Sequence, residues 1–164
     1  MTVNERARDS YLVSSDPALL DLKAIHAYLA RSYWSEGIPI EVVARSIRAS
    51  LCFGAYTSAG SDGASSKQVG FARVISDRAT FAYLCDVYVL EEHRGRGLSK
   101  RLMEAVLRHP DLTGLRRFVL ATRDAHGLYS RYGFTPLARP QVFMEIARPG
   151  LYKQRLEQQT GGGS

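Results

Sequence analysis

The chain has 164 residues, of which 45% are hydrophobic, and its length favours a single domain around one core. No apolar run approaches the roughly 20 residues that a membrane-spanning helix needs, and Met1 to Asp9 is polar, unlike a secretory signal. The net charge of +6 is compatible with a polyanionic ligand, and we expect a cytoplasmic protein without a membrane partner.

The N-terminal part predicts a short strand over Tyr11 to Val13, followed by two helices. Asp16 and Pro17 are typical of a helix start, as N-cap and first helical residue. A second helix is predicted to open at Pro39 and to end near Ser50. The first helix should extend to about residue 31, because an apolar stripe follows helical spacing: Leu19, Leu22, Ile25 and Leu29.

Three strands are predicted next, over Leu51 to Thr57, Gln68 to Ile75, and 80–90, because these segments are rich in β-branched and aromatic residues. The first two are joined by small polar residues from Ser58 to Lys67, a composition typical of a flexible hairpin loop. We expect the three strands to form an antiparallel meander.

The rest of the chain predicts an amphipathic helix from Leu98, then a strand, a short helix and a hairpin. The strand covers 117–122, and the helix covers 125–132 and is stopped by Gly133. The final hairpin is predicted over 134–137 and 142–146. We expect one domain over residues 1–150 and a C-terminal tail over 151–164 that ends in Gly-Gly-Gly-Ser.

The two cysteines, Cys52 and Cys85, lie in predicted strands among apolar neighbours. We interpret both as reduced thiols in the core rather than a disulfide or redox pair. Neither stands beside a histidine at metal-ligand spacing, so no metal site is predicted.

The most informative segment is the stretch Phe81 to Arg101, where a strand leads through a basic glycine-containing loop into a helix. Arg94, Gly95, Arg96 and Gly97 form the loop, and Leu98 and Ser99 begin the helix. The first N–H groups of a helix lack intrahelical partners, and the helix dipole favours negative charge there. The segment therefore predicts a site for a phosphate-bearing cofactor.

The known phosphate-binding loops fit this segment poorly. It lacks the G-x-x-x-x-G-K-[ST] pattern of nucleotide triphosphatases, and Lys100 stands where a dinucleotide-binding loop needs its third glycine.

The segment resembles motif A of the GNAT superfamily of acyl-CoA N-acetyltransferases, [Q/R]-x-x-G-x-[G/A]. Arg94 and Gly97 match, and Ser99 replaces the usual Gly or Ala. The strand before the loop also ends in the family's V-x-V pattern, here Val87-Tyr88-Val89. A second family pattern, N-x-x-A-x-x-x-Y-x-x-x-G-F, is matched apart from its Asn by Thr122, Ala125, Tyr129, Gly133 and Phe134.

This resemblance covers roughly positions 10 to 147 and implies an α/β (α+β) fold. The GNAT fold has a mixed, mostly antiparallel sheet with one splayed parallel strand pair and about four helices. In the family, acetyl-CoA lies in the gap between the splayed strands. The resemblance therefore implies that the backbone of Val87 to Val89 and the loop from Arg94 to Ser99 bind the cofactor.

Acetyl transfer to an amine needs a neutral amine, a stabilised oxyanion and a proton donor for the departing thiolate. Tyr129 occupies the family's tyrosine position and is our candidate general acid, while the Val87 N–H is the candidate that polarises the carbonyl. Asp86 is a candidate base, but it reads slightly better as a structural hydrogen-bond acceptor, because a buried acid in an apolar strand needs a partner. Asp124 and His126 are further candidates, and proton loss through water is also open.

The resemblance places Tyr33 and Trp34 in the region that lines the acceptor pocket. We expect direct transfer in a ternary complex to a small-molecule or peptide amine, by a monomer or homodimer. A non-catalytic acyl-CoA-binding or regulatory module is the alternative. A nucleic-acid-binding role is disfavoured, because 22 Lys and Arg are scattered among 16 Asp and Glu and no helix-turn-helix pattern is present.

Overall fold

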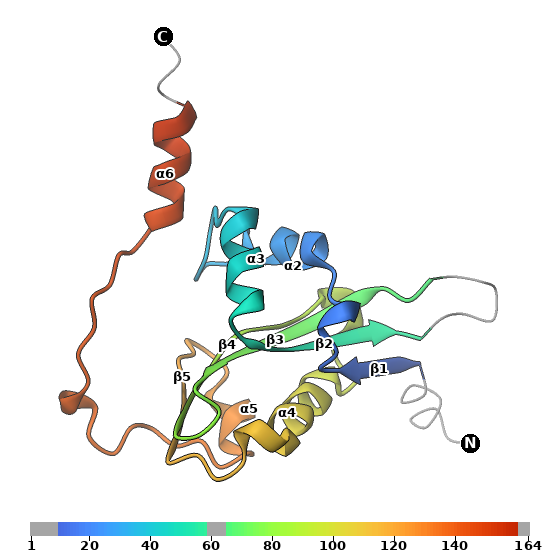
Figure 1. Ribbon diagram of the computed structural model, residues 1–164, viewed down its shortest axis with the longest axis vertical. Helices are drawn as coiled ribbons and strands as arrows, with labels where there is room; N and C mark the ends of the chain where they lie inside the picture. Colours follow the sequence, from blue (N-terminus) through green and yellow to red (C-terminus); the bar gives the residue numbers. More distant parts are fainter. Residues whose placement is uncertain (1–9, 59–64, 161–164) are drawn as a thin grey trace.

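The computed structural model describes residues 10–58 and 65–160, and a five-stranded mixed sheet forms its centre (Figure 1). The sheet order is β1-β2-β3-β4-β5, in which β1 to β4 are antiparallel and β5 runs parallel to β4. The predicted meander and the single parallel pair are confirmed. The strands are β1 (Tyr11–Ser14), β2 (Leu51–Thr57), β3 (Gln68–Ser76), β4 (Phe81–Val89) and β5 (Arg117–Leu120).

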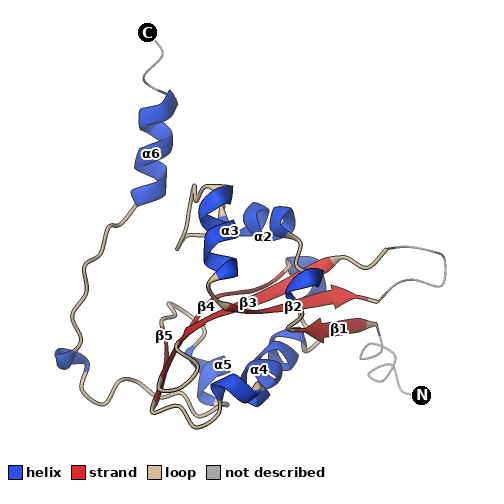
Figure 2. Cartoon of the chain, viewed as in Figure 1, coloured by secondary structure: helices blue, strands red, loops and turns tan. Residues whose placement is uncertain are grey.

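Helices cover both faces of this sheet (Figure 2). The pair α2 and α3 lies on one face, α4 and α5 lie on the other, and α6 stands apart at the end of an extended segment. The described residues hold five α-helices, namely α2 (Leu22–Leu29), α3 (Ile40–Arg48), α4 (Leu98–Arg108), α5 (His126–Ser130) and α6 (Leu151–Thr160). Short 3-10 helices are η1 (Pro17–Leu19), η2 (Glu91–His93), η3 (Pro110–Leu112) and η4 (Pro140–Val142). None of the helices described is long and apolar enough to cross a membrane.

The predicted first helix is split in two, because the chain has a capping aspartate at each of two nearby positions. The Asp16 carboxylate accepts from the Ala18 N–H at 2.9 Å and caps η1. Five residues later, the Asp21 carboxylate accepts from the Ala24 N–H at 3.0 Å and caps α2. Each cap satisfies first-turn N–H groups, so the chain restarts its helix at Leu22.

The core consists of one cluster on each face of the sheet. Below the sheet, α4 buries Leu102, Met103 and Val106 completely against strand residues such as Val74. Above it, α2 and α3 pack Ile25 and Val43 against Phe71 and Tyr88. These two clusters hold β3 and β4 firmly in the middle of the sheet.

The hairpin predicted over 134–137 and 142–146 is wrong, because these residues form no strand and Val142 is the last residue of η4. Pro136 and Pro140 offer no backbone N–H to a partner strand, which weakens pairing along this segment. As a result, β5 is an edge strand of the sheet formed by the described residues.

Residues 151–160 form α6, where we expected part of a tail. Three further predictions lie wholly or partly outside the described residues: the polar start Met1 to Asp9, the tip of the β2–β3 loop (59–64) and the Gly-Gly-Gly-Ser end.

Candidate active site

The candidate site opens where β4 and β5 separate. The two strands pair only from Phe81 opposite Arg117 to Leu84 opposite Leu120. Just beyond Leu84, the β3–β4 register shifts and Asp86 adopts a left-handed backbone with φ of 53°. A bulge bends its strand, so the second half of β4 is left without a strand partner on the β5 side among the described residues.

A cavity of about 1250 Å³ fills this gap. Its walls come from the second half of β4, the end of β5, the α2–α3 loop and α5. The sequence-predicted residues among its lining are Tyr33, Trp34, Asp86, Val87, Tyr88, Val89, Arg94, Ser99 and Tyr129. Sequence positions almost a hundred residues apart therefore meet in one cleft.

The glycine loop lies beside this cleft and leads into α4. Gly95 and Gly97 have φ values of 73° and 77°, a region in which L side chains are strained. A β-carbon built on either glycine would have no atom within 4 Å, so there is open space directly beside the loop. Gly97 is the N-cap of α4 and no side chain caps this helix end. The loop therefore presents backbone N–H groups and open space, as a phosphate would require.

The remaining loop residues have different surroundings. The Arg94 guanidinium is fixed by its Nε, which donates to the Val89 carbonyl at 3.0 Å, and it lies 3.5 Å from the Tyr28 hydroxyl. Arg96 is exposed, whereas the Leu98 side chain is buried in the core. Only the backbone of Leu98 is therefore left to serve a cofactor.

The Asp86 carboxylate has both oxygens engaged. Its Oδ2 lies 2.7 Å from Arg73 Nε in an ion pair, and its Oδ1 accepts from Trp34 Nε1 at 3.0 Å. The Arg73 and Asp86 side chains are 14% and 10% exposed, so this is a largely buried pair. Arg73 also donates to the Ser50 hydroxyl at 3.1 Å. This arrangement favours the structural interpretation of Asp86 over its use as a base.

Tyr129 projects from α5 into the cleft and is 8% exposed. Burial raises the pKa of its hydroxyl, with further contributions from Tyr33 and Asp124. The phenol therefore keeps its proton through the neutral pH range, as a proton donor must. Asp124 lines the same cavity, whereas His126 is exposed and is not among the lining residues.

Aromatic rings from α2, the α2–α3 loop and β4 line part of the cleft. Tyr28 stacks on Tyr88 with ring centroids 3.7 Å apart, and Tyr33 contacts Trp34 edge to face at 5.0 Å. The Arg123 guanidinium lies 3.9 Å from the centre of the Tyr33 ring and joins the α2–α3 loop to the end of β5. The predicted pair Tyr33 and Trp34 thus belongs to a larger aromatic surface.

Sequence reasoning missed Tyr28, Arg73 and Arg123. Arg73 left one signal in the sequence, because it is the only charged residue in strand β3 and stands between apolar neighbours. A buried charge in such a strand needs a partner of opposite sign, and Asp86 on the neighbouring strand was the available acid. The sequence gives no such signal for Tyr28 or Arg123, since their contacts depend on how separate segments meet in the folded chain.

A comparison with known protein families matches residues 50–136 to the acetyltransferase (GNAT) domain. A proposed acetyltransferase of Gibberella zeae is 38% identical over 141 residues, which cover 76% of this chain and 78% of the relative.

Solved structures agree. A proposed GNAT-family acetyltransferase from Xanthomonas campestris pv. campestris is 59% identical, with a TM-score of 0.79, and covers 87% of this chain and 96% of its own. A proposed acetyltransferase from Clostridium acetobutylicum, solved with acetyl-CoA, shares the fold at 15% identity and a TM-score of 0.56, covering 84% and 94% of the two chains. The family match, the strand divergence and the glycine loop lead to one conclusion: this chain belongs to the GNAT superfamily of acetyltransferases.

Proposed function

We propose that this protein is an acetyl-CoA-dependent N-acetyltransferase that acts in the cytoplasm. The acceptor is a primary amine of a small molecule or a peptide, and the acetyl group moves directly to it in a ternary complex. Membership of an acetyltransferase family supports the reaction class. The choice of cofactor, acceptor and direct transfer is our inference from the cleft.

The observation that carries the proposal is the single cavity in the gap between β4 and β5, which is lined by Arg94 and Ser99 at the two ends of the glycine loop and also by Tyr129. The open space beside Gly95 and Gly97 fits a phosphate group at the start of α4. The backbone of Val87 to Val89 borders the gap and suits an extended arm that needs peptide-like hydrogen bonds. The residues present therefore fit acetyl-CoA.

Bound acetyl-CoA would supply an activated acetyl group as a thioester. The chain's own groups then have three tasks. The Val87 N–H would donate to the carbonyl oxygen as negative charge develops there. The Tyr129 hydroxyl would donate its proton to the leaving sulfur. The aromatic wall around Trp34 would hold the acceptor, whose amine must arrive without its proton.

A non-catalytic acyl-CoA-binding module is the second candidate. It is favoured by the engagement of both Asp86 oxygens, because the cleft then lacks this carboxylate as a free base. An enzyme would then need another acceptor for the amine proton, and Asp124 or water could take that role.

Two measurements on the wild-type protein separate these candidates. Calorimetry with acetyl-CoA tests the cofactor, and release of free thiol in the presence of a panel of primary amines tests turnover. We expect saturable acetyl-CoA binding and amine-dependent thiol release. Binding without turnover on any amine would support the binding module, and absence of acetyl-CoA binding would reject both candidates.

A further inference from the structure

Three arginines line the cleft without a carboxylate partner in the described part of the chain. They are Arg31, Arg94 and Arg123, and none of them takes part in the ion pairs found there. A cation of this kind attracts an anionic group of a ligand, because the walls of a cleft focus its field. Each arginine is therefore a candidate contact for an anionic part of the cofactor or of the acceptor.

Two of the three arginines lie beside the glycine loop. Arg94 belongs to the loop, and its Nε donates to the Val89 carbonyl at 3.0 Å. The Arg31 guanidinium lies 5.4 Å from the centre of the Tyr28 ring, and the hydroxyl of this tyrosine is 3.5 Å from Arg94. Both arginines are therefore close to the place proposed for the phosphates of the cofactor.

Arg123 lies elsewhere, in the turn between β5 and α5. Its side chain is exposed, and the guanidinium lies over the Tyr33 ring, 3.9 Å from the ring centre. The pKa of the Tyr129 hydroxyl is raised mainly by burial and further by Tyr33 and Asp124, so both residues lie near that hydroxyl. A guanidinium over a ring can still donate from its edge to a carboxylate or a phosphate. Arg123 thus offers an anion site on the Tyr129 side of the cleft.

Asp124 follows Arg123 in the same turn and supplies the opposite charge. It lines the cleft, and it forms no ion pair within the ranges 10–58 and 65–160. Its carboxylate suits the amine of an acceptor, because it attracts the ammonium form of that amine. The other acids of the cleft are placed differently, since Asp86 is paired with Arg73 and the residues Glu91–His93 form η2 before the glycine loop.

We propose that the acceptor is a primary amine that also carries an acidic group, a carboxylate or a phosphate, and that Arg123 selects it. The inference rests on the proposed function and names the substrate class of the same cleft. The amine lies at Asp124 and Tyr129, and the acidic group accepts from the Arg123 guanidinium. The body between them lies on the aromatic surface of Tyr33 and Trp34.

The first test compares matched acceptors by thiol release. β-Alanine and γ-aminobutyrate are each set beside their own carboxamide, and phosphoethanolamine is set beside ethanolamine, with rates expressed per neutral amine. We expect the acidic member of a pair to have a kcat/KM roughly tenfold higher, the worth of a charged hydrogen bond. The pair with the larger ratio distinguishes a carboxylate from a phosphate. A ratio near one for every pair would overturn the proposal.

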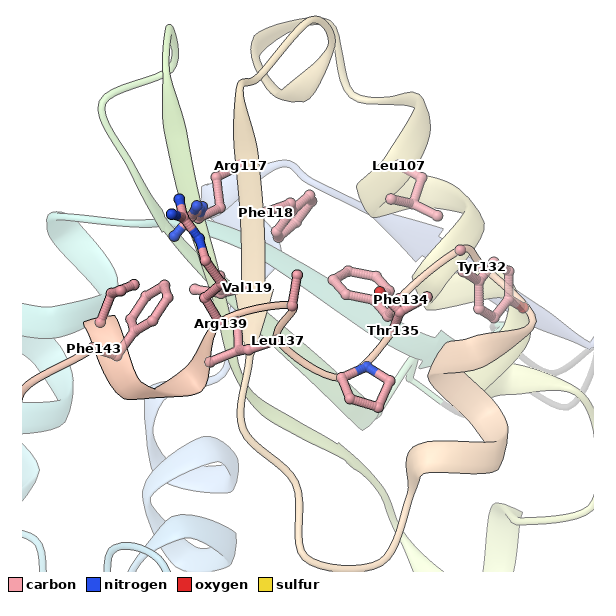
Figure 3. Close-up of a pocket in the computed structure, with 14 residues that line it drawn as sticks. Leu107, Arg117, Phe118, Val119, Tyr132, Phe134, Thr135, Leu137, Arg139 and Phe143 are labelled. Atoms are coloured by element: carbon pink, nitrogen blue, oxygen red, sulfur yellow. The ribbon is translucent and has the colours of Figure 1, made fainter.

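Arg123→Gln should reduce that ratio to about one, and Arg123→Lys should keep part of it, because the charge remains. Arg117→Gln is the matched control and should keep the full ratio. Its guanidinium also faces a ring, 5.0 Å from the centre of Phe143, but it lines a smaller cavity of about 420 Å³ beside β5 (Figure 3). If Arg123 only held Tyr33 in place, both members of a pair would lose rate equally and the ratio would persist, which would refute selection by Arg123.

The second test measures binding without turnover. Trp34 is the only tryptophan of the chain and lines the cleft, so its fluorescence reports occupancy. The protein is titrated with the same acceptors in the presence of free coenzyme A, which carries no acetyl group. We expect saturable binding of the acidic acceptors, roughly tenfold tighter than that of their neutral partners, and loss of this difference in Arg123→Gln.

The two tests separate the failure of this inference from the failure of the proposed function. Thiol release without preference for the acidic member would refute the inference and leave the N-acetyltransferase standing. Preferential binding of the acidic member that depends on Arg123, without thiol release, would reject the reaction and support the acid-selective site. Absence of binding by every acidic acceptor would overturn the inference.

Discussion

Tyr129 and Tyr132 are one helical turn apart, yet they face different parts of the molecule. Tyr129 lines the cleft, and no described residue hydrogen-bonds to its hydroxyl. Tyr132 lines the smaller cavity beside β5 instead, and its hydroxyl donates to the Lys100 carbonyl at 3.4 Å. Only the first of these phenols is placed to give a proton to a group held in the cleft.

Tyr129→Phe should therefore lower kcat by roughly 10²- to 10⁴-fold, the range for loss of a general acid. Acetyl-CoA affinity should change little, because the ring remains. Tyr132→Phe is the control and should be nearly silent. Steady-state kinetics with calorimetry on both variants provide the check, and equal effects of the two substitutions would remove the assigned role.

The pH dependence of the rate follows from the same hydroxyl. The protonated phenol is the active form, and burial raises its pKa above the ordinary value. The loss of activity caused by deprotonation of Tyr129 should therefore lie at higher pH than for an ordinary tyrosine, and Tyr129 should cause no fall in the rate near neutral pH. A pH–rate profile of the wild type tests this, and a fall near neutral pH that disappears in Tyr129→Phe would contradict it.

Asp86 is expected to act through structure, because Arg73 and Trp34 occupy its two oxygens. Asp86→Asn keeps an acceptor for Trp34 but leaves the buried Arg73 charge uncompensated. We expect a loss of about 3 kcal/mol in the free energy of unfolding, as found when one partner of a buried pair is removed. Urea denaturation measures this loss.

The matched control is Asp111→Asn, which breaks the exposed pair between Arg78 and Asp111. It should cost no more than about 1 kcal/mol. In the folded Asp86→Asn protein the acidic limb of the pH–rate profile should persist. Disappearance of that limb with acetyl-CoA affinity intact would make Asp86 the base after all.

At the scale of elements, the site depends on one glycine turn at the start of α4. Gly97→Val should abolish acetyl-CoA binding, because the new side chain enters the open space beside the loop. The substitution also strains a residue with φ of 77°. Gly114→Val separates these effects, since Gly114 has a similar φ of 71° and a similarly open surrounding but lies between η3 and β5, not at the start of α4.

We expect both glycine variants to lose similar thermal stability and only Gly97→Val to lose binding. Calorimetry and thermal unfolding of the two proteins give the comparison. Equal affinities would show that the loop does not hold the cofactor.

Arg94→Glu tests the charge of the same loop. Its guanidinium is anchored to the Val89 carbonyl at the edge of the cleft, so a carboxylate there would repel phosphate groups. We expect loss of acetyl-CoA binding without unfolding, measured by calorimetry. Arg108→Glu, at the far end of α4 and outside the cleft, should bind normally, and a normal affinity for Arg94→Glu would count against the loop.

The sequence predicted those elements whose signals are local. The strands β2, β3 and β4 and the start of α4 were predicted to within a residue or two. The β-branched and aromatic residues that indicate each strand lie within that strand, and the glycine loop that precedes α4 is a run of consecutive residues. The prediction of a hairpin over 134–137 and 142–146 was wrong, since a strand must pair with the edge of another strand and a local sequence pattern does not show whether that pairing forms. The second cap at Asp21 was a local signal, and it was overlooked because the apolar stripe continued across it.

The same distinction applies to the candidate site. The loop from Arg94 to Ser99 could be read from consecutive residues. The partner of Asp86 could not, because Arg73 reaches it across the sheet through the bulge between β3 and β4. The contact of Arg123 with Tyr33 joins segments ninety residues apart, and only the folded chain brings them together.

On the scale of the whole molecule, α6 stands apart from the sheet and buries no residue. Its described contacts to the rest of the chain are near Glu36 and Gly37. Removal of residues 151–164 should therefore change the melting temperature by no more than a few degrees and leave acetyl-CoA affinity unchanged. Thermal unfolding and calorimetry of the truncated protein test this, and lost affinity would make α6 part of the site.

The most direct test of the central claim is a crystal structure of the protein with acetyl-CoA. The account predicts pyrophosphate at the N–H groups of Gly95 to Ser99, the pantetheine arm between β4 and β5, and sulfur within hydrogen-bonding reach of the Tyr129 hydroxyl. Acetyl-CoA bound outside this cleft, or with its sulfur distant from Tyr129, would contradict the account.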